Sequence, residues 1–128
     1  MEINTRQLIN MLIQLAEADK HFAKVERELI LRVSKSHQVP EETVLSLIRN
    51  PEPIDDLHLL TPDQKFEYLY LAIDLIFADH NIFDSEVVFC KNIAVKLGFK
   101  KQAIDYFVEH FGKKSYDEFK IVILRNYC

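Results

Sequence analysis

Apolar residues recur every three or four positions along almost the whole chain, which is the spacing of one face of an α-helix. Leu8, Leu12 and Leu15 begin the first such stripe, and Leu29 and Val33 lie on the second. No segment alternates apolar and polar residues convincingly, so we expect no β-sheet. The pattern predicts seven helices, at about 4–19, 24–37, 40–50, 62–79, 84–97, 101–111 and from 116 onward.

Capping residues support these boundaries. Ser or Thr three residues before Gln or Glu is a capping box, which starts a helix, and glycine favours the position just after a helix. Proline fits the first helical position because it lacks a backbone N–H group. The start signals are Thr61 with Gln64, Ser115 with Glu118, Pro40 and Asp84, and the stop signals are Gly98 and Gly112.

The stretch 50–60 is the one irregular connection. Pro51 and Pro53 end the preceding helix, and its apolar residues predict a packed connection rather than a free linker. These residues are Ile54, Leu57, Leu59 and Leu60. The helix that follows is apolar almost all round, which is typical of the buried centre of a domain.

A shift of sixty residues aligns the first half of the chain with the second. Ile13 then falls on Ile73, and Val44 falls on Ile104, so that apolar positions coincide at helical spacing. Self-similarity at a fixed period is the signature of a duplicated supersecondary unit. We therefore predict one all-α domain over 1–128, a bundle with an internal pseudo-twofold repeat of helical hairpins. The repeat units are about 8–48 and 68–108, and 50–60 connects them.

Composition and charge limit the kinds of partner and the cellular location that we expect for this chain. The chain of 128 residues has a net charge of −4, which argues against nucleic acid because phosphate binding needs a basic surface. No apolar run approaches the roughly 20 residues that span a membrane, and no signal peptide is visible, so we expect a cytoplasmic protein. We expect a monomer or a homodimer. Cys90 lies on an apolar stripe and is expected to be buried, whereas Cys128 is expected to be an exposed thiol.

The two halves share an acidic loop between helices. Asp19 and Glu26 flank the first copy, and Asp79, Asp84 and Glu86 lie in the second. One interpretation is structural: the aspartate accepts backbone N–H groups of the turn, and the glutamate favours the start of the next helix. The other is a divalent cation bound by clustered carboxylates, with the second loop the richer in ligands. Asp74 is expected to face away from that loop.

Catalytic and transition-metal signatures are missing from the sequence. The five histidines have no helical pair spacing, and no phosphate-binding glycine loop or nucleophile motif occurs. A hydrolase that uses the acidic loops around a metal is therefore the weakest of the functional hypotheses. We expect no catalytic residues and no organic cofactor.

Two strings carry a family resemblance, LIQLAEADKHFAKVERELILRVSK and LAIDLIFADHNIFDSEVVFCKNIAVKLGF. They resemble the TerB-like domain of tellurite-resistance proteins and the helical region that precedes the J-domain in DjlA-type co-chaperones. The hallmark is a helix that ends in Ala-Asp and a glutamate that opens the next helix. It matches Ala18, Asp19 and Glu26 in the first copy and Ala78, Asp79 and Glu86 in the second.

The resemblance extends from about Ile9 to Val108. Lys20 and His80 stand where the family has glycine, and Ala23 and Phe83 stand where it often has an acidic residue. The resemblance implies an all-helical bundle whose acidic surface senses or binds metal ions. The leading hypothesis is a non-enzymatic interaction module for a protein partner, with a role in stress response or ion homeostasis. A divalent-cation binding domain is the alternative.

Overall fold

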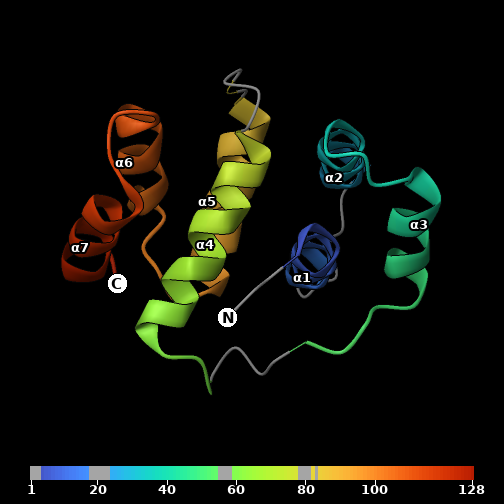
Figure 1. Ribbon diagram of the computed structural model, residues 1–128, viewed down its shortest axis with the longest axis horizontal. Coiled ribbons are helices and arrows are strands. Elements are labelled where there is room, and N and C mark those ends of the chain that lie inside the picture. Colours follow the sequence, from blue (N-terminus) through green and yellow to red (C-terminus); the bar gives the residue numbers. More distant parts are fainter. Residues whose placement is uncertain (1–3, 18–23, 55–58, 78–81, 83) are drawn as a thin grey trace. The chain divides into compact units, whose positions relative to one another are not determined.

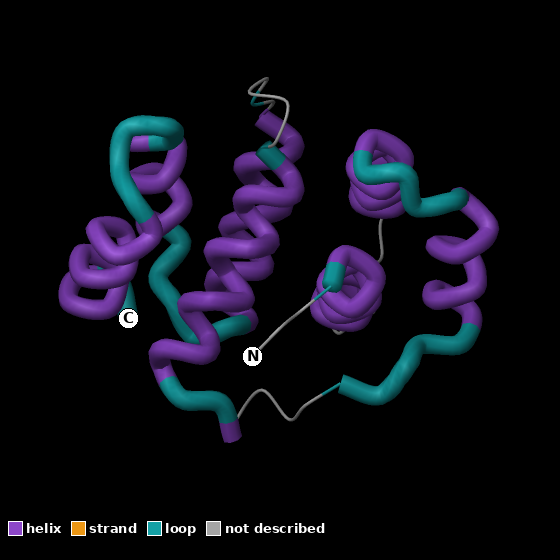
Figure 2. The backbone as a smooth tube through the Cα atoms, in the orientation of Figure 1, coloured by secondary structure: helices purple, strands orange, loops and turns teal. Residues whose placement is uncertain are grey.

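The computed structural model describes residues 4–17, 24–54, 59–77, 82 and 84–128. Over these residues it is all-α and contains no strand, as predicted (Figure 2). The chain divides into two compact units, Met1–Ile54 and Asp55–Cys128. Each unit has its own set of packed helices.

The first unit, Met1–Ile54, contains three helices that all pack against one another. They are α1 (Thr5–Glu17), α2 (Lys24–Ser36) and α3 (Glu41–Arg49) (Figure 1). Its buried side chains are mostly aliphatic, including Ile13, Ile30, Val44 and Leu47. Asn10 is buried among the apolar residues of α1, with 2% of its surface exposed. A buried amide requires hydrogen-bond partners, which are described below.

The second unit, Asp55–Cys128, contains four helices. They are α4 (Pro62–Ile76), α5 (Asp84–Lys96), α6 (Gln102–His110) and α7 (Tyr116–Asn126). α4 packs against α5 and α7, and α5 packs against α6. Aromatic rings fill much of the interior: Phe66 lies near Phe107, Tyr70 and Tyr116, with ring centroids 5.2–6.2 Å apart. Such pairs stabilise a core beyond the apolar area that they bury.

The helix ends confirm most of the predicted signals. Thr61 with Gln64 and Ser115 with Glu118 form complete capping boxes, in which each side chain accepts a hydrogen bond from the other residue's backbone N–H group. Gly98 and Gly112 have φ angles of 98° and 77°, which a residue with a side chain adopts only with strain. Pro40 was expected at the first helical position, but it is the N-cap of α3, so this helix starts one residue later than predicted.

The helix bounds keep the register of sixty residues, since α5 starts and ends sixty positions after α2. Ile13 and Ile73 are both buried, as are Val44 and Ile104. The packing differs between the units, however. α3 packs against both α1 and α2, whereas α6 packs against α5 and α7 lies on α4. The internal repeat is therefore not confirmed and remains a description of the sequence.

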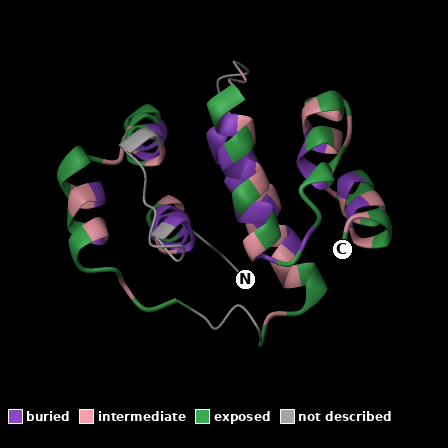
Figure 3. Ribbon diagram, turned by 180° about the vertical axis from the view of Figure 1, so that it is seen from behind, coloured by how far each residue is buried: buried purple, intermediate pink, exposed green. Residues whose placement is uncertain are grey.

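The connection after α3 is not packed in the way that its apolar residues predicted. Leu59 is 81% exposed and Ile54 is 37% exposed, while Leu57 lies outside the described residues. Figure 3 shows exposed and half-buried residues along the described part of this stretch. The segment is held instead through the backbone of Glu52, which contacts polar side chains of α1. The prediction of a packed connection is wrong for Ile54 and Leu59, whereas Leu60 is half-buried.

Candidate functional site

The acidic residues predicted to bind a cation are only partly within the described structure. Asp19 and Asp79 lie outside it. Glu26 is half-buried in the first turn of α2, and Asp84 is exposed at the first residue of α5. Glu86, in contrast, is buried with 2% of its surface exposed. Within the described ranges, no three His, Cys, Asp or Glu side chains lie close enough to hold a metal ion.

Glu86 lies one turn before Cys90 on α5, and both side chains are buried. Burial of the thiol, and secondarily the charge of Glu86, raises the pKa of Cys90 above its ordinary value. Because the thiolate is the reactive form of cysteine, Cys90 is inert near neutral pH. Cys90 is thus the buried apolar residue that the sequence predicted, and Cys128 is exposed as predicted.

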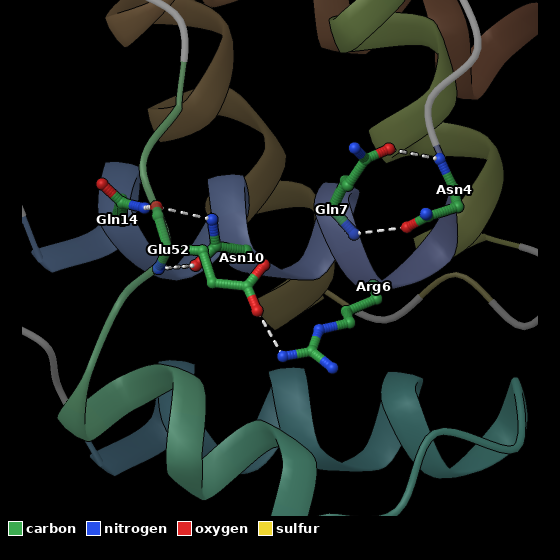
Figure 4. Close-up of polar contacts among 6 residues, drawn as sticks. All are labelled: Asn4, Arg6, Gln7, Asn10, Gln14 and Glu52. Carbon is green, nitrogen blue, oxygen red and sulfur yellow. Dashed lines mark hydrogen bonds and ion pairs between the residues drawn. The ribbon is translucent and has the colours of Figure 1, made fainter.

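A polar cluster fixes the end of the first unit to α1 (Figure 4). Asn10 Nδ2 donates to the Glu52 carbonyl oxygen at 3.0 Å, and the Glu52 N–H group donates to Asn10 Oδ1 at 3.1 Å. Gln14 Nε2 donates to the same carbonyl oxygen at 2.6 Å. Arg6 forms an ion pair with the Glu52 carboxylate. We call these four residues the Glu52 clamp; it satisfies both backbone groups of a residue outside any helix.

An open hollow lies where α2 ends and α3 begins, with a volume of about 570 Å³. We call it the α2–α3 hollow. Leu31, Val39 and Pro40 supply apolar surface, and Gln38 turns the chain with a φ of 59°. Its remaining lining residues are charged: Arg32, Lys35 and Glu41, all exposed.

A second, smaller hollow of about 220 Å³ lies in the second unit among α4, α6 and α7. We call it the aromatic hollow. Four aromatic residues line it, and one aliphatic residue, two charged residues and a glycine complete it. In order along the chain the lining residues are Tyr70, Ile73, Asp74, Phe107, Phe111, Gly112, Lys114 and Phe119.

The electrostatics of the aromatic hollow are set by Asp74 and Lys114. Asp74 follows Tyr70 by one helical turn, and burial together with the Asp74 charge raises the pKa of the Tyr70 hydroxyl. Asp74 and Lys114 form no ion pair with each other or with any other described residue. The hollow therefore presents an aromatic wall beside a carboxylate and an ammonium group that form no ion pair with the described residues.

The sixty-residue register relates the aromatic hollow to the Glu52 clamp. Asn10 and Gln14 correspond to Tyr70 and Asp74, and Glu52 corresponds to Gly112. In the first unit the side chains at these positions hydrogen-bond to the backbone of the following segment. In the second unit they line an open volume together with Gly112. Corresponding positions are thus closed in one unit and open in the other.

Sequence reasoning missed both of these features. Asn10 and Gln14 interrupt an apolar stretch, and polar residues on a helix are usually taken as solvent-facing. Asp74 was set aside as facing away from the acidic loop, and Lys114 was not among the candidate residues. Comparison of the two halves at polar as well as apolar positions would have drawn attention to Gln14 and Asp74.

None of the helices in the described part of the chain combines the length and apolar character needed to cross a membrane. Comparison of the chain with family models, with curated proteins and with solved structures finds no match. The resemblance to TerB-like domains accordingly remains a prediction from the sequence, and the fold rests on the structure alone.

Proposed function

We propose that this chain is a non-enzymatic, TerB-like helical module that binds another protein in the cytoplasm, in stress response or ion homeostasis. The observation that supports a binding role most directly is the α2–α3 hollow. Its volume of about 570 Å³ falls within the roughly 300–1,000 Å³ of typical ligand sites, and it is open to solvent. A hollow of this size accommodates one or two side chains of a partner segment.

The charges around the α2–α3 hollow favour an acidic partner segment. Arg32 and Lys35 lie one turn apart on α2, next to the apolar surface of Leu31 and Val39. Glu41 lies at the start of α3 and gives the hollow a polarity, with cations toward α2 and an anion toward α3. In a chain with a net charge of −4, this local pair of cations is the feature that a complementary partner would recognise. We propose a segment with an apolar anchor residue flanked by acidic residues.

The cation-binding alternative has no comparable support. Two of its five residues, Asp19 and Asp79, lie outside the described structure, and Glu26 and Glu86 belong to different units. Asp84 is exposed, and Glu86 is buried. It therefore remains a prediction of the sequence. Thermal melts with and without calcium, magnesium, manganese or zinc test it, because a bound cation raises the melting temperature.

Selection of short random peptides on the full chain tests the proposed function. We expect the enriched peptides to combine an apolar residue with acidic neighbours. The double substitution Arg32→Glu and Lys35→Glu should weaken their binding at least about tenfold, because it replaces two attractive charges with repulsive ones. The matched control is Lys101→Glu with Lys113→Glu, which makes the same charge change at exposed lysines of the second unit.

The control variant should bind as the unchanged chain does, and circular dichroism should show the same helix content in all three proteins. Enrichment of basic or uncharged peptides would contradict the proposed partner chemistry. Equal loss of binding in both double variants would show that overall charge, rather than the α2–α3 hollow, determines the interaction.

A further inference from the structure

The aromatic hollow combines three recognition elements: an aromatic wall, a carboxylate and an ammonium group. Its walls are the rings of Tyr70, Phe107, Phe111 and Phe119, and the Phe107 and Phe119 rings stack with centroids 4.6 Å apart. Asp74 and Lys114 border it and have no ion-pair partner among the described residues. Phe107 and Phe119 are buried, whereas Tyr70 and Phe111 are half-buried. The rings therefore form a rigid base with a wall that a ligand can reach.

We propose that the aromatic hollow binds a free α-amino acid with an apolar side chain, with its ammonium group at Asp74 and its carboxylate at Lys114. The side chain would pack against the aromatic wall, where apolar surface leaves water. This site lies in the second unit, and the α2–α3 hollow lies in the first. The two proposals are therefore independent, and each has its own test.

The pair of charges selects the class of ligand. A simple organic amine would be attracted by Asp74 and by the face of Tyr70 but repelled by Lys114. A simple carboxylic acid would be attracted by Lys114 and repelled by Asp74. A zwitterion satisfies both groups at once, and each charge-assisted hydrogen bond is stronger than a neutral one.

The volume selects the size of the ligand. About 220 Å³ is below the roughly 300–1,000 Å³ of sites for drug-sized molecules, so the hollow fits one amino acid rather than a nucleotide or a folded segment. Its lining is mainly apolar and aromatic with a few charged groups, which is the usual composition of small-molecule sites.

The Glu52 clamp shows that the corresponding face of α1 recognises a peptide-like group. There Asn10 accepts a hydrogen bond from the Glu52 N–H group at 3.1 Å and donates one to the Glu52 carbonyl oxygen at 3.0 Å. In the second unit the carboxylate of Asp74 replaces the amide of Gln14. An ionised carboxylate only accepts hydrogen bonds, so it suits an ammonium donor and not a carbonyl oxygen. The segment at Gly112 also turns with a left-handed φ, which Glu52 does not have.

Titration of the ¹⁵N-labelled full chain followed by NMR tests the proposal with three probes. L-Phenylalanine carries both charges, phenethylamine carries only the ammonium, and 3-phenylpropionate carries only the carboxylate. We expect L-phenylalanine to shift the amide signals of Asp74, Gly112 and Lys114, and to leave those of Lys35 and Gln38 unchanged. Each single-charge probe should bind at least about tenfold more weakly, since it forms one charge-assisted contact fewer and meets one repulsive charge.

Variants assign the two charges. Asp74→Asn and Lys114→Met should each weaken L-phenylalanine binding about tenfold or more. In the Asp74 variant, the affinity of L-phenylalanine should move closer to that of 3-phenylpropionate, which has no ammonium group. In the Lys114 variant, it should move closer to that of phenethylamine, which has no carboxylate. Glu109→Gln removes an exposed carboxylate of α6 that does not line the hollow and serves as the matched control, with binding unchanged. Asp74 is exposed, so its substitution should leave the fold intact.

Three outcomes would overturn the proposal. The first is the absence of any shift with L-phenylalanine at millimolar concentration. The second is equal or tighter binding of a single-charge probe, which would assign the hollow to amines or to carboxylates. The third is unchanged L-phenylalanine binding in both the Asp74 and the Lys114 variants.

Discussion

The face of α1 that carries Asn10 and Gln14 and the face of α4 that carries Tyr70 and Asp74 occupy corresponding positions of the sequence but have different uses. On α1 the side chains close over the backbone of Glu52. On α4 they border an open volume of about 220 Å³. Polar side chains at corresponding positions of two helices can thus hold a backbone segment in one unit and form a candidate binding site in the other. Their role depends on the segment that returns to them.

The two units also differ in the types of residue that form their cores. All five tyrosines and all the phenylalanines except Phe22 belong to the second unit. The first unit buries Leu, Ile, Val and Met side chains instead. Flat, rigid rings meet at fixed angles, while aliphatic side chains interdigitate closely. The two units therefore differ in the types of residue that fill their interiors.

The largest predicted difference is in the free energy of unfolding, when Asn10 of the clamp and its counterpart Tyr70 are each substituted. Asn10→Leu removes two hydrogen bonds to Glu52 and leaves the Glu52 N–H group without its partner, so it should lower the free energy of unfolding by about 1–3 kcal/mol. Tyr70→Phe removes a hydroxyl that makes no hydrogen bond to the described residues and should change it by less than about 0.5 kcal/mol. Urea unfolding monitored by circular dichroism measures both changes. Similar losses of stability in the two variants would show that the two positions do not differ in their structural role.

A second contrast concerns Cys90 and its counterpart Ile30, which are both buried. Burial and the Glu86 charge raise the pKa of the Cys90 thiol in the folded chain. As the pH rises, the thiol of the unfolded chain is therefore deprotonated at a lower pH than the thiol of the folded chain. The unfolded state then binds fewer protons than the folded state, and stability falls above the ordinary thiol pKa of about 8.5. In a Cys128→Ser background, stability at pH 9.5 should be about 1.4 kcal/mol lower than at neutral pH from this group alone.

Cys90→Ala provides the control for that measurement. It should be less stable than the parent at neutral pH, because it leaves a small cavity, but it should lose the thiol contribution to the alkaline decline. Urea unfolding at pH 7.5 and 9.5 compares the two slopes. An identical alkaline decline in both proteins would show that Cys90 ionises as readily in the folded chain as in the unfolded one.

The smallest predicted effect concerns Ser34 and its counterpart Ala94, which are 1% and 0% exposed. The Ser34 hydroxyl has no hydrogen-bond partner among the described residues. Ser34→Ala removes this unsatisfied group and should raise the free energy of unfolding by up to about 1 kcal/mol. The reverse substitution, Ala94→Ser, should lower it. Thermal melts of the two variants measure the pair; a loss of stability on Ser34→Ala would indicate a partner for the hydroxyl.

Local features of the fold could be read from the sequence. The helix starts at Thr61 and Ser115 and the stops at Gly98 and Gly112 depend on neighbouring residues only, and they were predicted correctly. The burial of Cys90 followed from its place on an apolar stripe. The all-α class followed from the same periodicity.

Features that depend on distant segments were not predictable in this way. The Glu52 clamp joins residues about forty positions apart, and nothing near Asn10 specifies Glu52 as its partner. Burial of Glu86 was also unexpected, because an acidic residue in the first turn of a helix is usually solvent-exposed. The exposure of Leu59 reversed the expectation from its apolar character, since the contacts that hold this connection to α1 are polar and are made by Glu52.

Hydrogen exchange of two backbone amides tests the contrast between the closed and the open face most directly. The Glu52 N–H group donates to Asn10 Oδ1 at 3.1 Å, whereas the Gly112 N–H group makes no hydrogen bond to the described residues. Exchange of the native chain followed by NMR should therefore be slow at Glu52 and fast at Gly112. In the Asn10→Leu variant, Glu52 should exchange as fast as Gly112. Equal exchange rates at the two amides in the unchanged chain would show that the Glu52 N–H group is no better protected than that of Gly112.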